Sequence, residues 1–100
     1  MVTLTYRHGG DWRPEHVSKA LRAYREWCRR RGFASRYTWV AELQKRGVIH
    51  YHIALWVPHG QRVPYWDAQG WWPHGSTNLE RARNAVGYLM KYLRDRKSTR

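Results

Sequence analysis

The residues best suited to chemistry lie at 49–53, which read Ile-His-Tyr-His-Ile. They belong to a run of strand-forming residues that extends from 48 to 57. Because a β-strand sends alternate side chains to opposite faces, we expect His50 and His52 to share one face and the odd-numbered residues to share the other. Two imidazoles on one face can ligate one metal ion. The alternative is a pair of unrelated polar positions on a solvated sheet face.

A carboxylate on the preceding segment supplies a candidate third ligand. Residues 36–44 are rich in aromatic and β-branched types and predict a second strand. The short loop 45–47 ends in glycine and predicts a hairpin, in which Glu42 lies opposite His50, with Cβ atoms about 4.5–5.5 Å apart. A one-residue slip would instead turn Glu42 toward the apolar face, where a carboxylate is costly to bury.

The predicted site therefore consists of Glu42, His50 and His52. Two histidines and one carboxylate leave coordination positions open, which is typical of a catalytic divalent ion and not of a closed structural site. The ligand set leaves Mn²⁺, Mg²⁺ and Zn²⁺ open.

Composition points to a nucleic-acid partner. The chain has 100 residues, enough for one domain, and 19 Lys and Arg against 7 Asp and Glu give a net charge of +12. Seven Trp and seven Tyr accompany this charge, and a basic surface with aromatic side chains suits single-stranded nucleic acid, although many of these rings should be core. The DNA-binding candidates are Arg7, Lys45 and Arg46. Cys28 is the only cysteine, which excludes a disulfide framework. The absence of a long apolar stretch predicts a cytoplasmic protein without a membrane role.

The remaining sequence predicts an α+β fold. A first strand is expected at 2–6 and a helix from Pro14 to about Arg31, with Gly32 as its stop. A short edge strand is expected at 70–74. A final helix is expected from about Asn78 to Arg94, with Thr77 or Asn78 as its N-cap. Its predicted buried stripe consists of Leu79, Ala82, Val86, Leu89 and Leu93.

Two tyrosines of this final helix lie off the buried stripe. Tyr88 and Tyr92 are one turn apart on one face, and Lys91 is adjacent to that face. A tyrosine can act as a covalent nucleophile, and a nearby cation such as Lys91 would favour its phenolate or position a phosphate. The alternative is a helix packed on two sides, or tyrosines that serve as amphipathic surface cover.

Three blocks of the chain, in order, resemble the HUH endonuclease superfamily, in particular the rolling-circle replication initiators of small phages and plasmids. Residues 2–6 (Val-Thr-Leu-Thr-Tyr) are similar to its first motif, and residues 50–52 (His-Tyr-His) to its metal motif. Residues 88–92 (Tyr-Leu-Met-Lys-Tyr) are similar to its third motif, the nucleophile tyrosine followed three residues later by lysine. Glu42 matches the position where many members carry a third metal ligand.

The resemblance implies a central antiparallel sheet, RNA-recognition-motif-like or ferredoxin-like, with two main helices packed on it. It implies nicking and rejoining of single-stranded DNA at an origin, often a hairpin, through a 5′-phosphotyrosine. A host helicase and DNA polymerase would be partners. Tyr88 matches the nucleophile, and Tyr92 is either a second nucleophile, as in two-tyrosine initiators, or a packing aromatic. The nuclease domain would span 1–95, with a basic tail at 96–100, as a minimal nuclease or a domain of a larger initiator.

Two other functions remain open from the sequence. One is a related transposase or conjugative relaxase, which only the preferred DNA substrate would separate from an initiator. The other is a basic, non-catalytic module that binds single-stranded nucleic acid with strong salt dependence and leaves it uncut.

Overall fold

The computed structural model describes residues 1–45, 47–81, 87 and 89–91. Its elements, in chain order, are β1 (Val2–Tyr6), a 3-10 turn η1 (Gly9–Asp11), α1 (Pro14–Arg30), β2 (Arg36–Leu43), β3 (Ile49–Trp56) and β4 (Gly75–Leu79).

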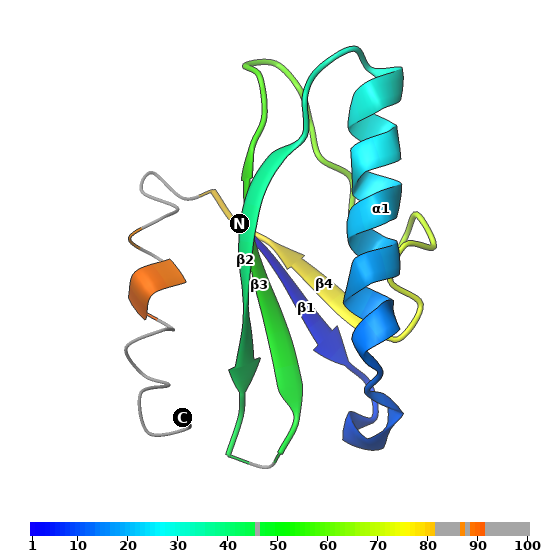
Figure 1. Ribbon diagram of the computed structural model, residues 1–100, viewed down its shortest axis with the longest axis vertical. Coiled ribbons are helices and arrows are strands. Elements are labelled where there is room, and N and C mark those ends of the chain that lie inside the picture. The colour runs from blue at the N-terminus through cyan, green and yellow to red at the C-terminus, as the bar shows by residue number, and fades with distance from the viewer. Residues whose placement is uncertain (46, 82–86, 88, 92–100) are drawn as a thin grey trace.

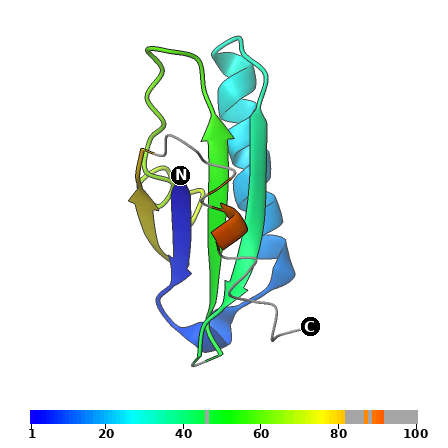
Figure 2. The same cartoon turned by 90° about the vertical axis from the view of Figure 1, so that its left-hand side faces the viewer.

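The four strands form one antiparallel sheet in the order β2-β3-β1-β4. Helix α1 covers one face of this sheet, and the helical residues 87 and 89–91 lie on the other side (Figure 1, Figure 2). The expected α+β fold with a central antiparallel sheet is therefore confirmed. Within the described residues, no helix is long and apolar enough to cross a membrane.

The alternation of apolar residues and threonines in β1 sets the two faces of the sheet. Val2, Leu4 and Tyr6 are buried, whereas Thr3 and Thr5 are half-buried on the opposite side. The three apolar side chains join the core formed with α1. The threonines consequently lie on the face away from α1.

Helix α1 begins and ends as the sequence predicts. Pro14 occupies the first turn, where a missing backbone N–H has no cost. At the other end, Phe33 N donates to Cys28 O (3.1 Å) and Gly32 N donates to Arg29 O (3.1 Å), which is a Schellman motif. Gly32 has a φ of 84°, a left-handed conformation that glycine adopts without steric cost. The predicted buried stripe is confirmed at Val17, Leu21, Tyr24 and Cys28, and Ala20 adds to it.

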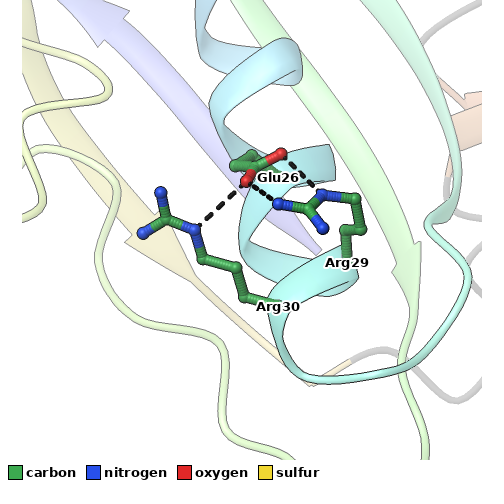
Figure 3. Close-up of polar contacts among 3 residues, drawn as sticks. All are labelled: Glu26, Arg29 and Arg30. Carbon is green, nitrogen blue, oxygen red and sulfur yellow. Dashed lines mark hydrogen bonds and ion pairs between the residues drawn. The ribbon is translucent and has the colours of Figure 1, made fainter.

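The outer face of α1 carries an ion-pair cluster near its C-terminal end. Glu26 accepts hydrogen bonds from Arg29 and from Arg30, the latter at 3.1 Å between Arg30 Nε and Glu26 Oε2 (Figure 3). The hydrogen bonds from Arg29, and then those from Arg30, lower the pKa of Glu26 to about 2. These two arginines are therefore largely occupied within the helix surface.

The fourth strand differs from the sequence prediction. The edge strand is Gly75–Leu79, not 70–74, and it pairs with β1 from Val2↔Leu79 to Tyr6↔Gly75. The expected helix start at Thr77 or Asn78 is wrong for the same reason, because both residues belong to this strand. The Ser-Thr-Asn segment has little strand signal of its own, and the open edge of β1 provides its hydrogen-bonding partner.

Of the predicted final helix, residues 87 and 89–91 are described and are helical. Leu89 is buried, as expected for the stripe, whereas Leu79 lies in β4. The other stripe positions, Ala82, Val86 and Leu93, lie outside the described residues.

Two tryptophans hold the long connection between β3 and β4 against the core. Trp66 and Trp72 are fully buried, and the Trp66 ring stacks on Tyr24 of α1 at 5.4 Å between centroids. Trp72 Nε1 donates to Thr5 O at 2.9 Å. Part of the aromatic content therefore builds the core, as the sequence allowed.

Candidate active site

The hairpin between β2 and β3 has the register that the sequence predicts. Glu42 lies opposite His50, and Leu43 lies opposite Ile49. The turn is closed by Gln44 N donating to Val48 O (2.8 Å) and by Gly47 N donating to Gln44 O (2.9 Å). Gly47 has a φ of 81°, which favours glycine at this position. The one-residue slip that would have turned Glu42 toward the core does not occur.

The central strand pairing adds two hydroxyls to the same face. Thr3 lies opposite His52, and Thr5 lies opposite His50, in the β1–β3 ladder. Since Tyr51 is buried in the core beneath α1, the two histidines that flank it point away from the helix. The face away from α1 thus presents the histidines, the glutamate and the threonines together.

His52 is held at both ring nitrogens. Its Nε2 lies 2.7 Å from Glu42 Oε1, and its Nδ1 lies 3.2 Å from Thr3 Oγ1. The residue is only 4 % exposed, and the Glu42 side chain is 19 % exposed. The carboxylate therefore reaches diagonally across the hairpin to His52, although its backbone lies opposite His50. This arrangement fixes the orientation of the buried ring.

His50 is the more accessible of the two histidines. Its ring centroid lies 6.4 Å from that of His52, at an interplanar angle of 62°. Burial lowers the pKa of His50, Glu42 opposes this shift, and His52 adds to it. The lowered pKa favours the neutral imidazole, which is the form that ligates metals.

The predicted metal ligands fit a divalent ion by type and by face. Two imidazoles and a carboxylate at neighbouring register positions are a donor set for Mn²⁺, Mg²⁺ or Zn²⁺. As the side chains stand, however, the described residues contain no group of three potential ligands close enough to hold an ion. The reason is visible at Glu42, whose oxygen bonds directly to the His52 nitrogen that would otherwise ligate.

The predicted nucleophile helix is described only in part. Lys91 is helical and exposed, and the helical residues 87 and 89–91 lie on the histidine side of the sheet (Figure 1, Figure 2). Tyr88 and Tyr92, the two predicted nucleophiles, lie outside the described residues.

The predicted DNA-binding cations lie at one end of the sheet. Arg7 follows β1 and Lys45 lies in the hairpin turn, and both are exposed. These two loops lie at the same end of the molecule, and a Cβ at Gly9 would come within 2.8 Å of Val48 (Figure 1). Arg46 lies outside the described residues.

Sequence reasoning did not assign a role to the threonines of β1. Thr3 contacts His52, and Thr5 Oγ1 lies 2.5 Å from Ser76 Oγ of β4. The alternation in β1 was the available signal, since it places both hydroxyls on one face. Their partners depend on the pairing of β1 with β3 and β4, which a single strand pattern does not specify.

Comparison with known proteins places the chain in a family. No curated protein and no solved structure matches it. The family model of the replication-associated protein ORF2 matches residues 1–97, which include every strand of the sheet and the predicted nucleophile segment. The chain belongs to this family of replication-associated proteins.

Proposed function

We propose that this replication-associated protein is a single-strand DNA endonuclease and strand transferase of the HUH type, which initiates rolling-circle replication. The observation that carries the proposal is the placement of Glu42, His50 and His52 on one sheet face at adjacent register positions. The helical residues 87 and 89–91 lie over the same side, which supports a nucleophile from that segment. The membership in a replication-associated family agrees with both.

A divalent ion, Mn²⁺ or Mg²⁺ with Zn²⁺ as an alternative, would be held by Glu42, His50 and His52. Such an ion would polarise the scissile phosphate and stabilise charge that develops during attack. The protein's own contribution is to orient the ligands. Thr3 and the buried strand backbone hold the His52 ring, and burial keeps His50 neutral by lowering its pKa.

Tyr88 is proposed as the nucleophile. Its phenolic oxygen attacks the phosphorus, and the bond from phosphorus to O3′ breaks. The phenolic proton ends on the leaving oxygen, which yields a 5′-phosphotyrosine and a free 3′-OH. The Lys91 ammonium would lower the cost of forming the phenolate or position the phosphate. Tyr92 would serve as a second nucleophile in a two-tyrosine scheme.

The test is formation of a covalent protein–DNA adduct. The protein is incubated with origin-containing single-stranded DNA and Mn²⁺, and the adduct is located by mass spectrometry. We expect Tyr88→Phe to abolish the first cleavage, and Glu42→Ala or a chelator to suppress it. An adduct that persists in the double variant Tyr88→Phe, Tyr92→Phe would contradict the tyrosine mechanism.

A second function, a non-catalytic DNA-binding module, is favoured by one observation. The direct hydrogen bond between Glu42 and His52 satisfies both groups without any ion. Such a module would bind strands with strong salt dependence and leave them intact with every divalent ion. Within the enzyme class, the preferred substrate would separate an initiator from a transposase or relaxase.

A further inference from the structure

Two partly exposed tryptophans lie on the α1 side of the sheet, opposite the histidine face. Trp39 of β2 is 40 % exposed, and Trp12, between η1 and α1, is 37 % exposed. Both contact Tyr51 of β3, which is itself 2 % exposed. We call Trp12, Trp39 and Tyr51 the tryptophan patch. The core does not account for this exposure, because a core tryptophan such as Trp66 is fully buried.

The rings of the tryptophan patch are held in fixed orientations. Trp12 Nε1 donates to Tyr51 OH at 2.7 Å. The Trp39 ring meets the edge of Tyr51, with centroids 5.7 Å apart and an interplanar angle of 69°. A buried tyrosine thus braces two exposed indoles, so that little rotamer entropy is lost when a ligand stacks on them.

The patch is close to the candidate active site through β2. Trp39 and Glu42 lie on the same strand but on opposite faces of the sheet. In the described part of the chain, β2 is an edge strand, and no other strand covers its outer side. A flexible linear ligand that passes around this edge would therefore contact both faces.

Charge identifies the occupant. Arg13 follows Trp12 directly and is exposed, and Lys45 is exposed in the turn that follows β2, while Asp11 is the acidic residue next to Trp12. The chain as a whole carries a net charge of +12. A second copy would bring the same excess of positive charge, whereas a polyanion with aromatic bases matches both the charge and the rings.

We infer that the tryptophan patch is a base-stacking site for single-stranded DNA, which holds a segment of the strand whose scissile phosphate lies on the histidine face. This inference rests on the proposed function for the identity of the DNA. It adds a contact surface on the opposite side of the sheet from the predicted metal ligands.

The test measures binding of fluorescein-labelled oligo(dT) by anisotropy, for the unmodified protein, Trp39→Ala, Trp39→Phe and Tyr65→Ala. We expect Trp39→Ala to raise Kd about fivefold to a hundredfold, the range for loss of one base–aromatic stack. Trp39→Phe should retain most of the affinity. Tyr65→Ala is the matched control, because Tyr65 is 53 % exposed in the loop between β3 and β4 and should leave Kd unchanged.

A second measurement covers the case in which Trp39→Ala does not fold. Stacking on DNA should quench tryptophan fluorescence in the unmodified protein, and Trp39→Phe should lose part of that quenching while it keeps its melting temperature. Equal quenching in both proteins, or an unchanged Kd in a folded Trp39→Ala, would overturn the inference. Loss of self-association in Trp39→Ala, seen by light scattering, would assign the patch to a second copy and also overturn it.

Failure of the proposed function gives a different result. Adduct formation at saturating DNA reports on the chemistry and not on the patch, so Trp39→Ala should form as much adduct as the unmodified protein. If neither protein forms an adduct while Trp39→Ala weakens binding, the endonuclease proposal fails and the stacking site stands. If both form an adduct and bind equally, the stacking site fails alone.

Discussion

The contact between Glu42 and His52 makes two substitutions at one position separable. Glu42→Ala removes the acceptor that lies 2.7 Å from His52 Nε2, in a residue that is 4 % exposed. Glu42→Gln keeps an amide oxygen in reach of that nitrogen and removes only the charge. We therefore expect the alanine variant to lose stability and metal binding, and the glutamine variant to lose mainly metal binding.

The magnitude follows from the burial of the pair. A buried polar group that loses a hydrogen bond costs about 1–3 kcal/mol. Since the Glu42 side chain is 19 % exposed, water can reach part of the vacated space, and we expect about 1–2 kcal/mol for Glu42→Ala. In a domain of this size each kcal/mol lowers Tm by about 4–8 °C. Glu42→Gln should stay within a few degrees of the unmodified protein.

The assay is a thermal melt followed by circular dichroism, with and without Mn²⁺. An ion that binds the folded state raises Tm, so Mn²⁺ should raise the Tm of the unmodified protein and have a smaller effect on both variants. Equal Tm values for the alanine and glutamine variants would refute the structural role of the hydrogen bond. An Mn²⁺ shift that is the same in all three proteins would refute Glu42 as a ligand.

Three further predictions concern the surrounding residues. Thr3→Val should reduce Mn²⁺ affinity and adduct formation together, with partial rescue by Thr3→Ser, because the hydroxyl that orients the ring of His52 is lost; titration calorimetry would show it, and equal affinity in Thr3→Val would contradict it. Burial lowers the pKa of His74 from 6.5, so the unfolded chain takes up the proton more readily and the free energy of unfolding should fall as the pH drops below about 6.5; urea melts should show a flatter profile for His74→Asn, and an unchanged profile would argue against it. Gly75→Ala should lower Tm strongly, because the added Cβ would overlap the backbone oxygen of Thr5 in β1; a Tm equal to that of the unmodified protein would show that β4 moves without cost.

The parts of the fold that the sequence predicts correctly are those set by local signals. Pro14 and Gly32 mark the ends of α1, and the loop 45–47 fixes the register of the β2–β3 hairpin. Period-2 alternation then assigns His50 and His52 to one face. Each of these depends on residues within a few positions of one another, so no long-range contact is needed to specify them.

The missed strand β4 depends on a distant partner. Thr77 and Asn78 are good helix caps and poor strand formers, so the local pattern favours a helix start. In the structure they pair with Leu4 and Thr3, more than 70 residues earlier in the chain. The available edge of β1 decides their conformation, and a local pattern carries no information about that edge.

The side-chain geometry of the site was also beyond the sequence. Register places Glu42 opposite His50, and the natural expectation is a contact between these two. The carboxylate instead bonds to His52, one position along the strand face. Both neighbours are within reach of a glutamate, so the choice is made by side-chain rotamers and by burial, which alternation does not specify.

The threonine at position 3 gives this geometry a chemical consequence. An ionised carboxylate can only accept, so His52 Nε2 carries the hydrogen in its bond to Glu42, and a neutral ring then presents Nδ1 as an acceptor to Thr3. If Nε2 ligates an ion, the hydrogen must move to Nδ1, and Thr3 must accept. A hydroxyl can take either role without moving, which a carbonyl or an amide nitrogen cannot do. Thr3 is therefore suited to hold the same ring orientation before and after an ion binds.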